Sequence, residues 1–227
     1  MKIYRYLHHG RIAESNTLPD GATLLAPVVP PKIVCVGRNY ADHAKELGNE
    51  APSEPIIFLK PTSALLAPEG TIVRPPQSSL VHHEAELAIV IGREAKNVKA
   101  GDWRDYVRGF ACANDVTARD LQRKDVQFTR GKSFDTFCPI GPHIETELDP
   151  SDLRVVARVN GEVKQDGRTS QMIFSCAVMI EFITSIMTLV PGDVILTGTP
   201  AGVGSLESGD VVEIEIEGIG VLRNAVS

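Results

Sequence analysis

The pattern of hydrophobic and polar positions along the chain predicts a fold rich in strands. Residues 32–37 form a short apolar run, which indicates a buried strand, and residues 84–91 alternate along a second one. Successive side chains of a strand point to opposite faces, so Glu84 and Glu86 share a face. The rest of that face and the whole opposite face are apolar. We therefore expect this strand to be covered on both sides.

Two further patterns predict strands in the second half of the chain. Residues 153–159 and 162–165 flank Asn160-Gly161, a pair that suits a type I′ turn, so we expect a hairpin here. From 212 to 217 apolar residues alternate with glutamates. This alternation predicts a strand with one face in water.

Helices are expected to be few. Residues 171–189 predict the longest helix, which is apolar nearly all round and is therefore expected inside the fold. A short helix is expected at 40–47, with Asn39 as its N-cap and Gly48 just past its end. A third helix is expected from 116 to about 125. The fold class is therefore mainly β, of the α+β type, rather than a doubly wound sheet.

Composition and charge favour an ordinary soluble globular protein. The 227 residues are 43% hydrophobic and 23% charged, which excludes a disordered tail and a fibrous repeat. The net charge of −6, without a basic run, argues against nucleic acid as a partner. Apolar runs are too short for a membrane span, and no signal-like segment is present, so we expect a cytoplasmic protein with no membrane partner. Four scattered cysteines are expected to be reduced thiols.

Three carboxylates are the first candidates for chemistry. Glu84 and Glu86 lie side by side on a strand expected to be buried, where two like charges need a cation or a shared proton. Asp115 ends another apolar run, although a lone aspartate there is more often a turn residue or a helix cap. If the strand ends meet, the three residues form an all-oxygen ligand set that suits Mg²⁺ or Mn²⁺. The alternative is an exposed strand end that carries two surface charges.

The short helix at 40–47 carries a candidate catalytic pair. His43 and Glu46 are three residues apart, so they share a face and can hydrogen-bond. A carboxylate that holds an imidazole makes it a better base for activating water, whereas an exposed helical pair is the alternative. Because so short a helix is marginal alone, we expect a lid that orders over a ligand. Arg38, just before it, is placed to reach an anion.

Two loops add candidate ligand contacts. Lys132 lies among small residues at 130–135 and suits a phosphate or carboxylate binder, an oxyanion stabiliser or a Schiff-base amine. Residues 196–204 are rich in glycine, so their backbone amides could bind a carboxylate, with a hydroxyl from Thr197 or Thr199. A plain turn after a strand explains these glycines equally well.

Taken in order, six blocks of the sequence resemble the fumarylacetoacetate hydrolase superfamily. The blocks are Val36–His43, Glu54–Pro61, His82–Leu87, Asp115–Gln122, Lys132–Asp135 and Leu196–Gly204. The resemblance runs from Lys32 to the end of the chain. It implies a mixed β-roll or sandwich with few helices, in a catalytic domain of residues 32–227 after a short N-terminal segment, residues 1–31. It also implies a homodimer with one divalent metal.

The resemblance also implies roles for the candidate residues. Metal ligands would be Glu84, Glu86 and Asp115. Catalytic residues would be His43, Glu46 and Lys132. Substrate contacts would come from Arg119, Gln122 and Thr199, together with the nearby Arg38.

The expected activity is divalent-metal-dependent cleavage of a small 2-oxo acid or 2-oxo dicarboxylate through a metal-stabilised enolate. Acylpyruvate hydrolysis and oxaloacetate decarboxylation are the reactions implied by the branch with the His43–Glu46 pair. One alternative is the isomerisation of 2-hydroxyhepta-2,4-diene-1,7-dioate, or the related decarboxylation of 5-carboxymethyl-2-oxohex-3-ene-1,7-dioate. An alternative of another class is a catalytically silent module that binds a metal and an oxo acid.

Overall fold

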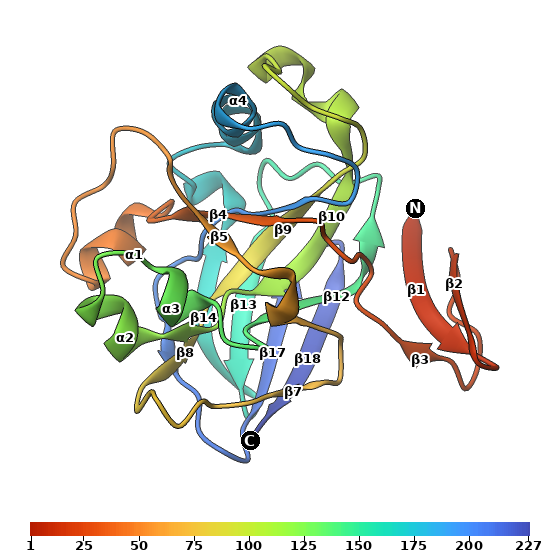
Figure 1. The fold of residues 1–227 in the computed structure, drawn as a ribbon, viewed down its shortest axis with the longest axis horizontal. Helices are drawn as coiled ribbons and strands as arrows, with labels where there is room; N and C mark the ends of the chain where they lie inside the picture. Colours follow the sequence, from red (N-terminus) through yellow and green to blue (C-terminus); the bar gives the residue numbers. More distant parts are fainter.

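The computed structural model describes residues 1–227, and strands dominate it (Figure 1). The strands are β1 (Lys2–His8), β2 (Arg11–Ser15), β3 (Thr23–Leu24), β4 (Ile33–Gly37), β5 (Ile56–Lys60), β6 (Leu65–Leu66), β7 (Thr71–Ile72), β8 (Val81–His83), β9 (Ala85–Ile91), β10 (Val107–Asn114), β11 (Thr117–Ala118), β12 (Cys138–Glu145), β13 (Arg154–Val159), β14 (Glu162–Arg168), β15 (Val194–Leu196), β16 (Gly204–Ser205), β17 (Val211–Ile216) and β18 (Gly220–Val226). The helices are α1 (Ala41–Glu46), α2 (Arg119–Lys124), α3 (Thr129–Lys132) and α4 (Cys176–Ile186), with the 3₁₀-helices η1 (Thr62–Ala64), η2 (Ala100–Tyr106) and η3 (Thr169–Gln171). The expected mainly β fold class is confirmed.

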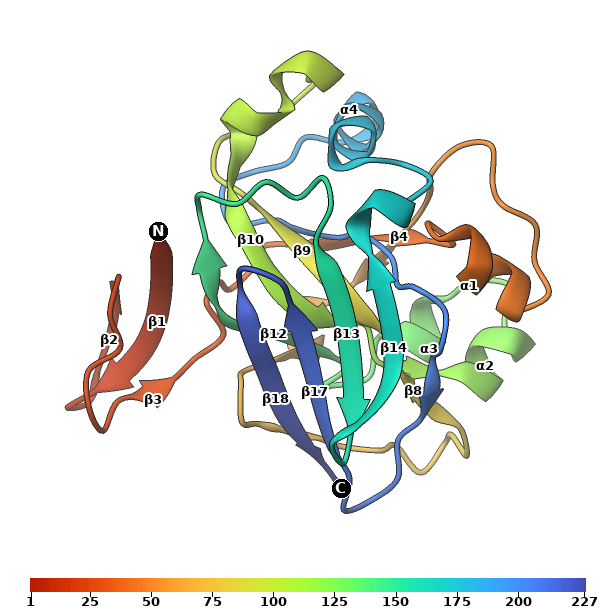
Figure 2. The same cartoon turned by 180° about the vertical axis from the view of Figure 1, so that it is seen from behind.

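Two sheets pack face to face and enclose the main core. A ten-stranded sheet runs in the order β2-β1-β12-β10-β9-β15-β4-β5, with β3 and β6 attached at its side. A five-stranded sheet, β14-β13-β17-β18-β7, lies in front of β9 and β10 in Figure 2. The larger hydrophobic core, 33 buried residues, contains side chains from both sheets. A small third sheet, β11-β8-β16, continues toward the helices.

Strand β9 is covered on both faces, as its sequence predicts. All of its residues are buried. Leu87 and Ile89 belong to the larger core, whereas Ala88 and Val90, on the opposite face, belong to a second core of 13 buried residues. A polar side chain on this strand is therefore taken out of water, which sets the electrostatics of the site described below.

The predicted hairpin and the predicted half-wet strand are both present. Asn160 and Gly161 have φ values of 52° and 81°, the left-handed backbone that a type I′ turn requires. They join β13 to β14. Along β17, Val212, Ile214 and Ile216 are buried, and the residues between them are partly exposed.

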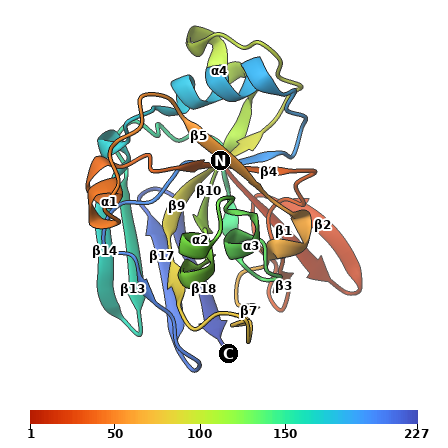
Figure 3. The ribbon, with the colours of Figure 1, turned by 60° about the vertical axis from the view of Figure 1, so that its left-hand side comes forward.

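The longest helix is shorter and less buried than predicted. α4 begins only at Cys176, where the Ser175 hydroxyl accepts a hydrogen bond from the Val178 amide. Val178 and Ile186 are 40% and 53% exposed, so the expectation that this helix lies inside the fold is wrong. α4 instead covers one end of the molecule, beside η2 (Figure 3). Because some residues on the exposed face of α4 are also apolar, the sequence does not show the amphipathic pattern of this helix.

Asn39 is not the N-cap that the sequence predicts. No side chain caps α1, and Tyr40 takes the cap position with extended backbone. The Asn39 amide is buried and donates to the Thr197 and Phe174 carbonyls at 2.8 and 3.0 Å. Tertiary hydrogen bonds therefore took priority over a local cap. Gly48 does follow the helix with a φ of 74°, as predicted.

The third predicted helix begins later than expected. Residues 117 and 118 form β11, and α2 starts at Arg119. Lys132 likewise ends the short helix α3 instead of lying in a loop. α1, α2 and α3 lie together on one side of the molecule (Figure 1), and residues of all three line the cavity described below. None of the helices is both long and apolar enough to cross a membrane.

Candidate active site

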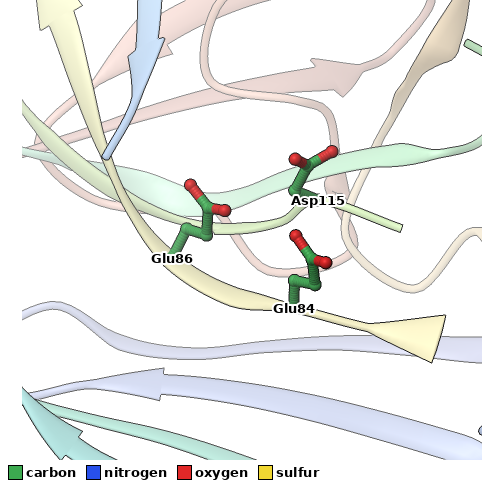
Figure 4. A group of neighbouring side chains, drawn as sticks. All are labelled: Glu84, Glu86 and Asp115. Carbon is green, nitrogen blue, oxygen red and sulfur yellow. The ribbon is translucent and has the colours of Figure 1, made fainter. Parts of the chain in front are cut away.

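Three carboxylates converge where neighbouring strands end. Glu86 lies on β9, Glu84 directly before it, and Asp115 directly after β10. Asn114 pairs with Ala85 in the antiparallel ladder, so the strand ends bring Asp115 beside both glutamates. All three side chains are buried, and their ligand atoms lie within 4.8 Å of one another (Figure 4). This compact all-oxygen set fits a divalent cation of the Mg²⁺ or Mn²⁺ kind.

The chain itself supplies three buried cations to two of these carboxylates. Arg119 donates to Glu84. Lys132 Nζ donates to Glu84 Oε2 at 2.7 Å and to Asp115 Oδ2 at 2.6 Å. Lys60 Nζ donates to Asp115 Oδ1 at 2.5 Å. Glu84 and Asp115 are therefore both in direct, charge-assisted contact with positive side chains of the chain itself.

Glu86 differs from its two neighbours because no cation contacts it. Its Oε2 accepts only the Gly198 amide, at 2.7 Å. Burial, together with the negative charge of Asp115, raises the pKa of Glu86 well above its usual value. Burial is the largest single influence on Glu84 and acts in the same direction, but the charges of Lys132 and Arg119 and the other lowering contributions together outweigh it and hold the pKa of Glu84 well below its usual value. The repulsion among the three carboxylates is therefore relieved in two ways. Cations of the chain contact Glu84 and Asp115, whereas Glu86 is left to a proton or a metal.

Metal binding is therefore expected to release a proton at a pH below the raised pKa of Glu86. A metal needs the Glu86 carboxylate, whereas the raised pKa of Glu86 favours its protonated form. Affinity for Mg²⁺ should rise with pH up to the raised pKa and level off above it. Calorimetric titration with Mg²⁺ in buffers of different ionisation enthalpy measures the release. Glu86→Gln should abolish it, and a wild-type titration without proton release would contradict the assignment.

Lys60 is a site residue that the sequence analysis missed. It ends β5, is 2% exposed and also donates to the Val116 carbonyl at 3.2 Å. Burying a lysine costs free energy unless its charge is paired, and Lys60 is paired with Asp115. The contact also restrains the position of the Asp115 carboxylate. The available signal was a lysine that closes the apolar run Ile56–Leu59, inside one of the six blocks.

His43 and Glu46 form the predicted pair. The two side chains lie 3.3 Å apart at Nδ1 and Oε2, and since a carboxylate only accepts, Nδ1 carries the proton. Glu46 also accepts the Gly202 amide at 3.1 Å, which ties α1 to the loop after β15. Burial lowers the pKa of His43, against the opposing charge of Glu84. At neutral pH the imidazole is therefore neutral, with Nε2 free to accept a proton.

The loop at 196–204 uses its amides differently from the expectation. The Gly198 and Gly202 amides bind carboxylates, but these belong to Glu86 and Glu46 of the chain itself. Thr197 and Thr199 have different roles. Thr197 donates to the Leu87 carbonyl at 2.9 Å inside the fold, whereas Thr199 lines the cavity described next.

A cavity of about 370 Å³ joins these groups. Nine of the ten predicted site residues line it: Arg38, His43, Glu84, Glu86, Asp115, Arg119, Gln122, Lys132 and Thr199. The tenth, Glu46, acts on the cavity only through His43. Arg38 has a φ of 56°, a strained backbone that is frequent at functional sites. A cavity of this size suits a small molecule.

Most of the chain is similar to known proteins. Residues 32–227 match the family described as fumarylacetoacetate (FAA) hydrolase C-terminal. An uncharacterised protein of Methanocaldococcus jannaschii is 60% identical over 199 residues, which cover 88% of this chain and 84% of that protein. The human protein named oxaloacetate tautomerase FAHD2A, mitochondrial, is 49% identical over 228 residues, which cover 94% of this chain and 73% of that protein.

A solved structure shares the whole fold. The crystal structure of 5-carboxymethyl-2-hydroxymuconate delta-isomerase from Mycobacterium smegmatis has a TM-score of 0.92 and 45% identity, over 100% of this chain and 98% of that one. Both the match over most of the sequence and the likeness of the fold point the same way. The chain belongs to the fumarylacetoacetate hydrolase family.

Proposed function

We propose that the protein is a divalent-metal-dependent enzyme that moves a proton beside the 2-oxo group of a small 2-oxo acid, with a 2-oxo dicarboxylate as the preferred class. The observation that supports it is the buried group Glu84, Glu86 and Asp115 at the wall of a small cavity. Two of the relatives described above are named a tautomerase and an isomerase, and both names denote proton transfer between carbon and oxygen or between carbons.

The three carboxylates would hold Mg²⁺ or Mn²⁺. A divalent cation there would polarise the 2-oxo group and stabilise negative charge on its oxygen when a proton leaves the neighbouring carbon. Lys132 adds a second positive charge. Two of its three N–H groups bind Glu84 and Asp115, so one N–H is left for an oxygen of the substrate.

Lys132 acts in this scheme as an oxyanion stabiliser and not as a Schiff-base amine. Burial alone would lower the pKa of Lys132, but the charges of Asp115 and Glu84 outweigh it and raise that pKa. A protonated amine has no lone pair with which to attack a carbonyl. Arg119 donates hydrogen bonds to Glu84 and to Gln122 Oε1, the second at 2.5 Å. This second contact holds Gln122 at the cavity wall.

His43 is the proposed base that takes the proton and returns it. Its neutral Nε2 can accept while Glu46 holds Nδ1. Because burial lowers the pKa of His43, activity should fall on the acid side, at a pH below about 6.5. The pH dependence of kcat/KM for the wild type, at Mg²⁺ concentrations that saturate the site at every pH, measures this fall. His43→Gln should remove it, and an acid limb that persists in this variant would contradict the role.

The direct test is the conversion of enol-oxaloacetate to its keto form, followed by loss of the enol absorbance with Mg²⁺ and with excess EDTA. Pyruvate release from oxaloacetate and from acetylpyruvate is measured in parallel, with enzyme-free controls because the metal alone decarboxylates oxaloacetate. Metal-dependent tautomerisation supports the proposal. A protein that binds the acids but turns over none of them would be the catalytically silent module.

Cleavage of the same class of substrate is the second candidate, and the His43–Glu46 pair favours it. A base held by a carboxylate can activate water against the distal carbonyl of an acylpyruvate, which releases pyruvate and a fatty acid. Decarboxylation of oxaloacetate needs no water. All of these reactions share the enolate, so the cavity supports each of them, and relative rates on the substrates above decide among them.

A further inference from the structure

The buried side chain of Gln165 joins three parts of the site without lining the cavity. It extends from β14 of the five-stranded sheet and is 1% exposed. Its Oε1 accepts from the Ala85 amide at 2.9 Å and from His83 Nδ1 at 3.0 Å. Its Nε2 donates to Thr199 Oγ1 and to the Pro200 carbonyl, both at 2.7 Å. One amide group thus links the strand of the metal ligands to the loop that carries Thr199.

The orientation of this amide is fixed by its surroundings. The Ala85 amide can only donate, so the atom that faces it must be the oxygen. The Pro200 carbonyl can only accept, so the atom that faces it must be the nitrogen. A flipped Gln165 would lose these bonds and leave buried polar groups unpaired, which is costly.

This orientation determines what the Thr199 hydroxyl can do. Thr199 Oγ1 accepts a hydrogen bond from Gln165 Nε2, so the hydroxyl's own proton is not used in that contact. The residue makes no donated hydrogen bond to the chain, and it lines the same cavity as Lys132. Its proton is therefore left for an acceptor inside the cavity. Thr197 differs, because its hydroxyl donates its proton in a hydrogen bond to the Leu87 carbonyl.

The loop has little freedom to escape this arrangement. A Cβ atom added to Gly202 would lie 2.2 Å from the Lys164 carbonyl oxygen, and one added to Gly167 would lie 2.6 Å from Pro200 Cβ. β14 and the loop therefore touch backbone to backbone. Ala85 also lies between Glu84 and Glu86, so the Oε1 contact restrains the strand that carries both carboxylates.

We propose that Gln165 is a positioning residue that presets the Thr199 hydroxyl as a hydrogen-bond donor to an anionic oxygen of the ligand. The ligand class, a carboxylate next to a 2-oxo or enolate oxygen, rests on the proposed function. Gln165 itself does not touch the ligand. It acts by occupying the acceptor side of Thr199 and by holding the loop at a fixed distance from the metal ligands.

The test is a double-mutant cycle read by oxalate binding, a dianion with adjacent carboxylates, in calorimetry at saturating Mg²⁺. In Gln165→Glu the new carboxylate accepts but cannot donate, so Thr199 turns its proton toward it and oxalate affinity falls by about tenfold. Thr199→Val should lose the same amount, and the double variant no more than either. Thr199→Ser retains a hydroxyl and should recover the affinity that Thr199→Val loses.

Asn224→Asp is the matched control for placing a carboxylate in a buried amide position. Asn224 is 1% exposed and donates to the Ala67 and Gly70 carbonyls, away from the cavity. This variant should leave oxalate affinity unchanged. If Gln165→Glu fails to fold, Gln165→Met replaces it, with a smaller loss and the same non-additivity with Thr199→Val.

The outcomes separate the two proposals. Losses that add in the double variant would overturn the positioning role, because a merely structural residue would not depend on the Thr199 hydroxyl. Affinity unchanged in the folded Gln165 variants would overturn it as well. A wild-type protein that binds no oxalate with Mg²⁺ would overturn the proposed function, and this inference with it.

Discussion

Replacing Glu86 with alanine is expected to abolish metal binding and to lower turnover of a 2-oxo acid by about 10³-fold or more. Glu86 is the carboxylate that no cation contacts, so a divalent cation is its natural partner. The charge stabilisation that a metal supplies in such reactions amounts to several kcal/mol, which corresponds to a loss of this size. Calorimetry with Mg²⁺ and initial rates with the three substrates measure both effects.

Glu213→Ala provides the matched control for this substitution. Glu213 also lies on a strand, β17, but it faces partly into water and does not line the cavity. It should bind Mg²⁺ and turn over substrate as the wild type does. Retained stoichiometric metal binding in Glu86→Ala would contradict the ligand assignment, whatever the rate.

Glu86→Gln separates metal binding from stability. The amide oxygen still accepts the Gly198 N–H, and the ionisable group with the raised pKa is gone. Without metal this variant should unfold at a temperature no lower than the wild type. Mg²⁺ should raise the melting temperature of the wild type only, because a ligand stabilises the folded state in proportion to its binding.

The parts of the site that the sequence predicts are those that depend on local rules. Strand periodicity places Glu84 and Glu86 on one face, and the end of an apolar run marks Asp115. Helical spacing places His43 beside Glu46. The structure brings all five together because β9, β10 and α1 meet at the same cavity.

The parts that the sequence does not reveal depend on packing between distant segments. Gln165 contacts the Ala85 amide across 80 positions of sequence, and Lys60 reaches Asp115 across 55. No local pattern distinguishes either residue from an ordinary polar side chain. At Asn39 a local pattern was present but misleading. Its position in the sequence suits an N-cap, whereas in the structure its amide donates to tertiary partners instead.

The fold follows the same division. The hairpin around Asn160-Gly161 is predicted correctly, since the turn residues themselves require left-handed backbone. The extent of α4 is not, because the apolar residues 172–174 continue the helical pattern, whereas the helix begins only at Cys176, after its N-cap Ser175. Local propensity sets where a turn occurs, whereas the surrounding structure decides where this helix starts.

Replacing His43 with alanine should affect the candidate reactions unequally. Hydrolysis of acetylpyruvate needs a base to activate water, so its kcat should fall by about 10²- to 10⁴-fold. Tautomerisation of enol-oxaloacetate needs the same group for proton transfer and should fall with it. Decarboxylation of oxaloacetate uses the positive charges of the site and not the base, so its rate should fall by less than about tenfold.

Lys45→Ala, on the same short helix, is the control for disturbance of α1. Lys45 is exposed and has no partner among the site residues, so all rates should stay at the wild-type level. Equal losses on the three reactions in His43→Ala would argue that α1 acts only as a cover that excludes water. A selective loss would show that the His43 imidazole handles protons, because a cover without a base affects every substrate alike.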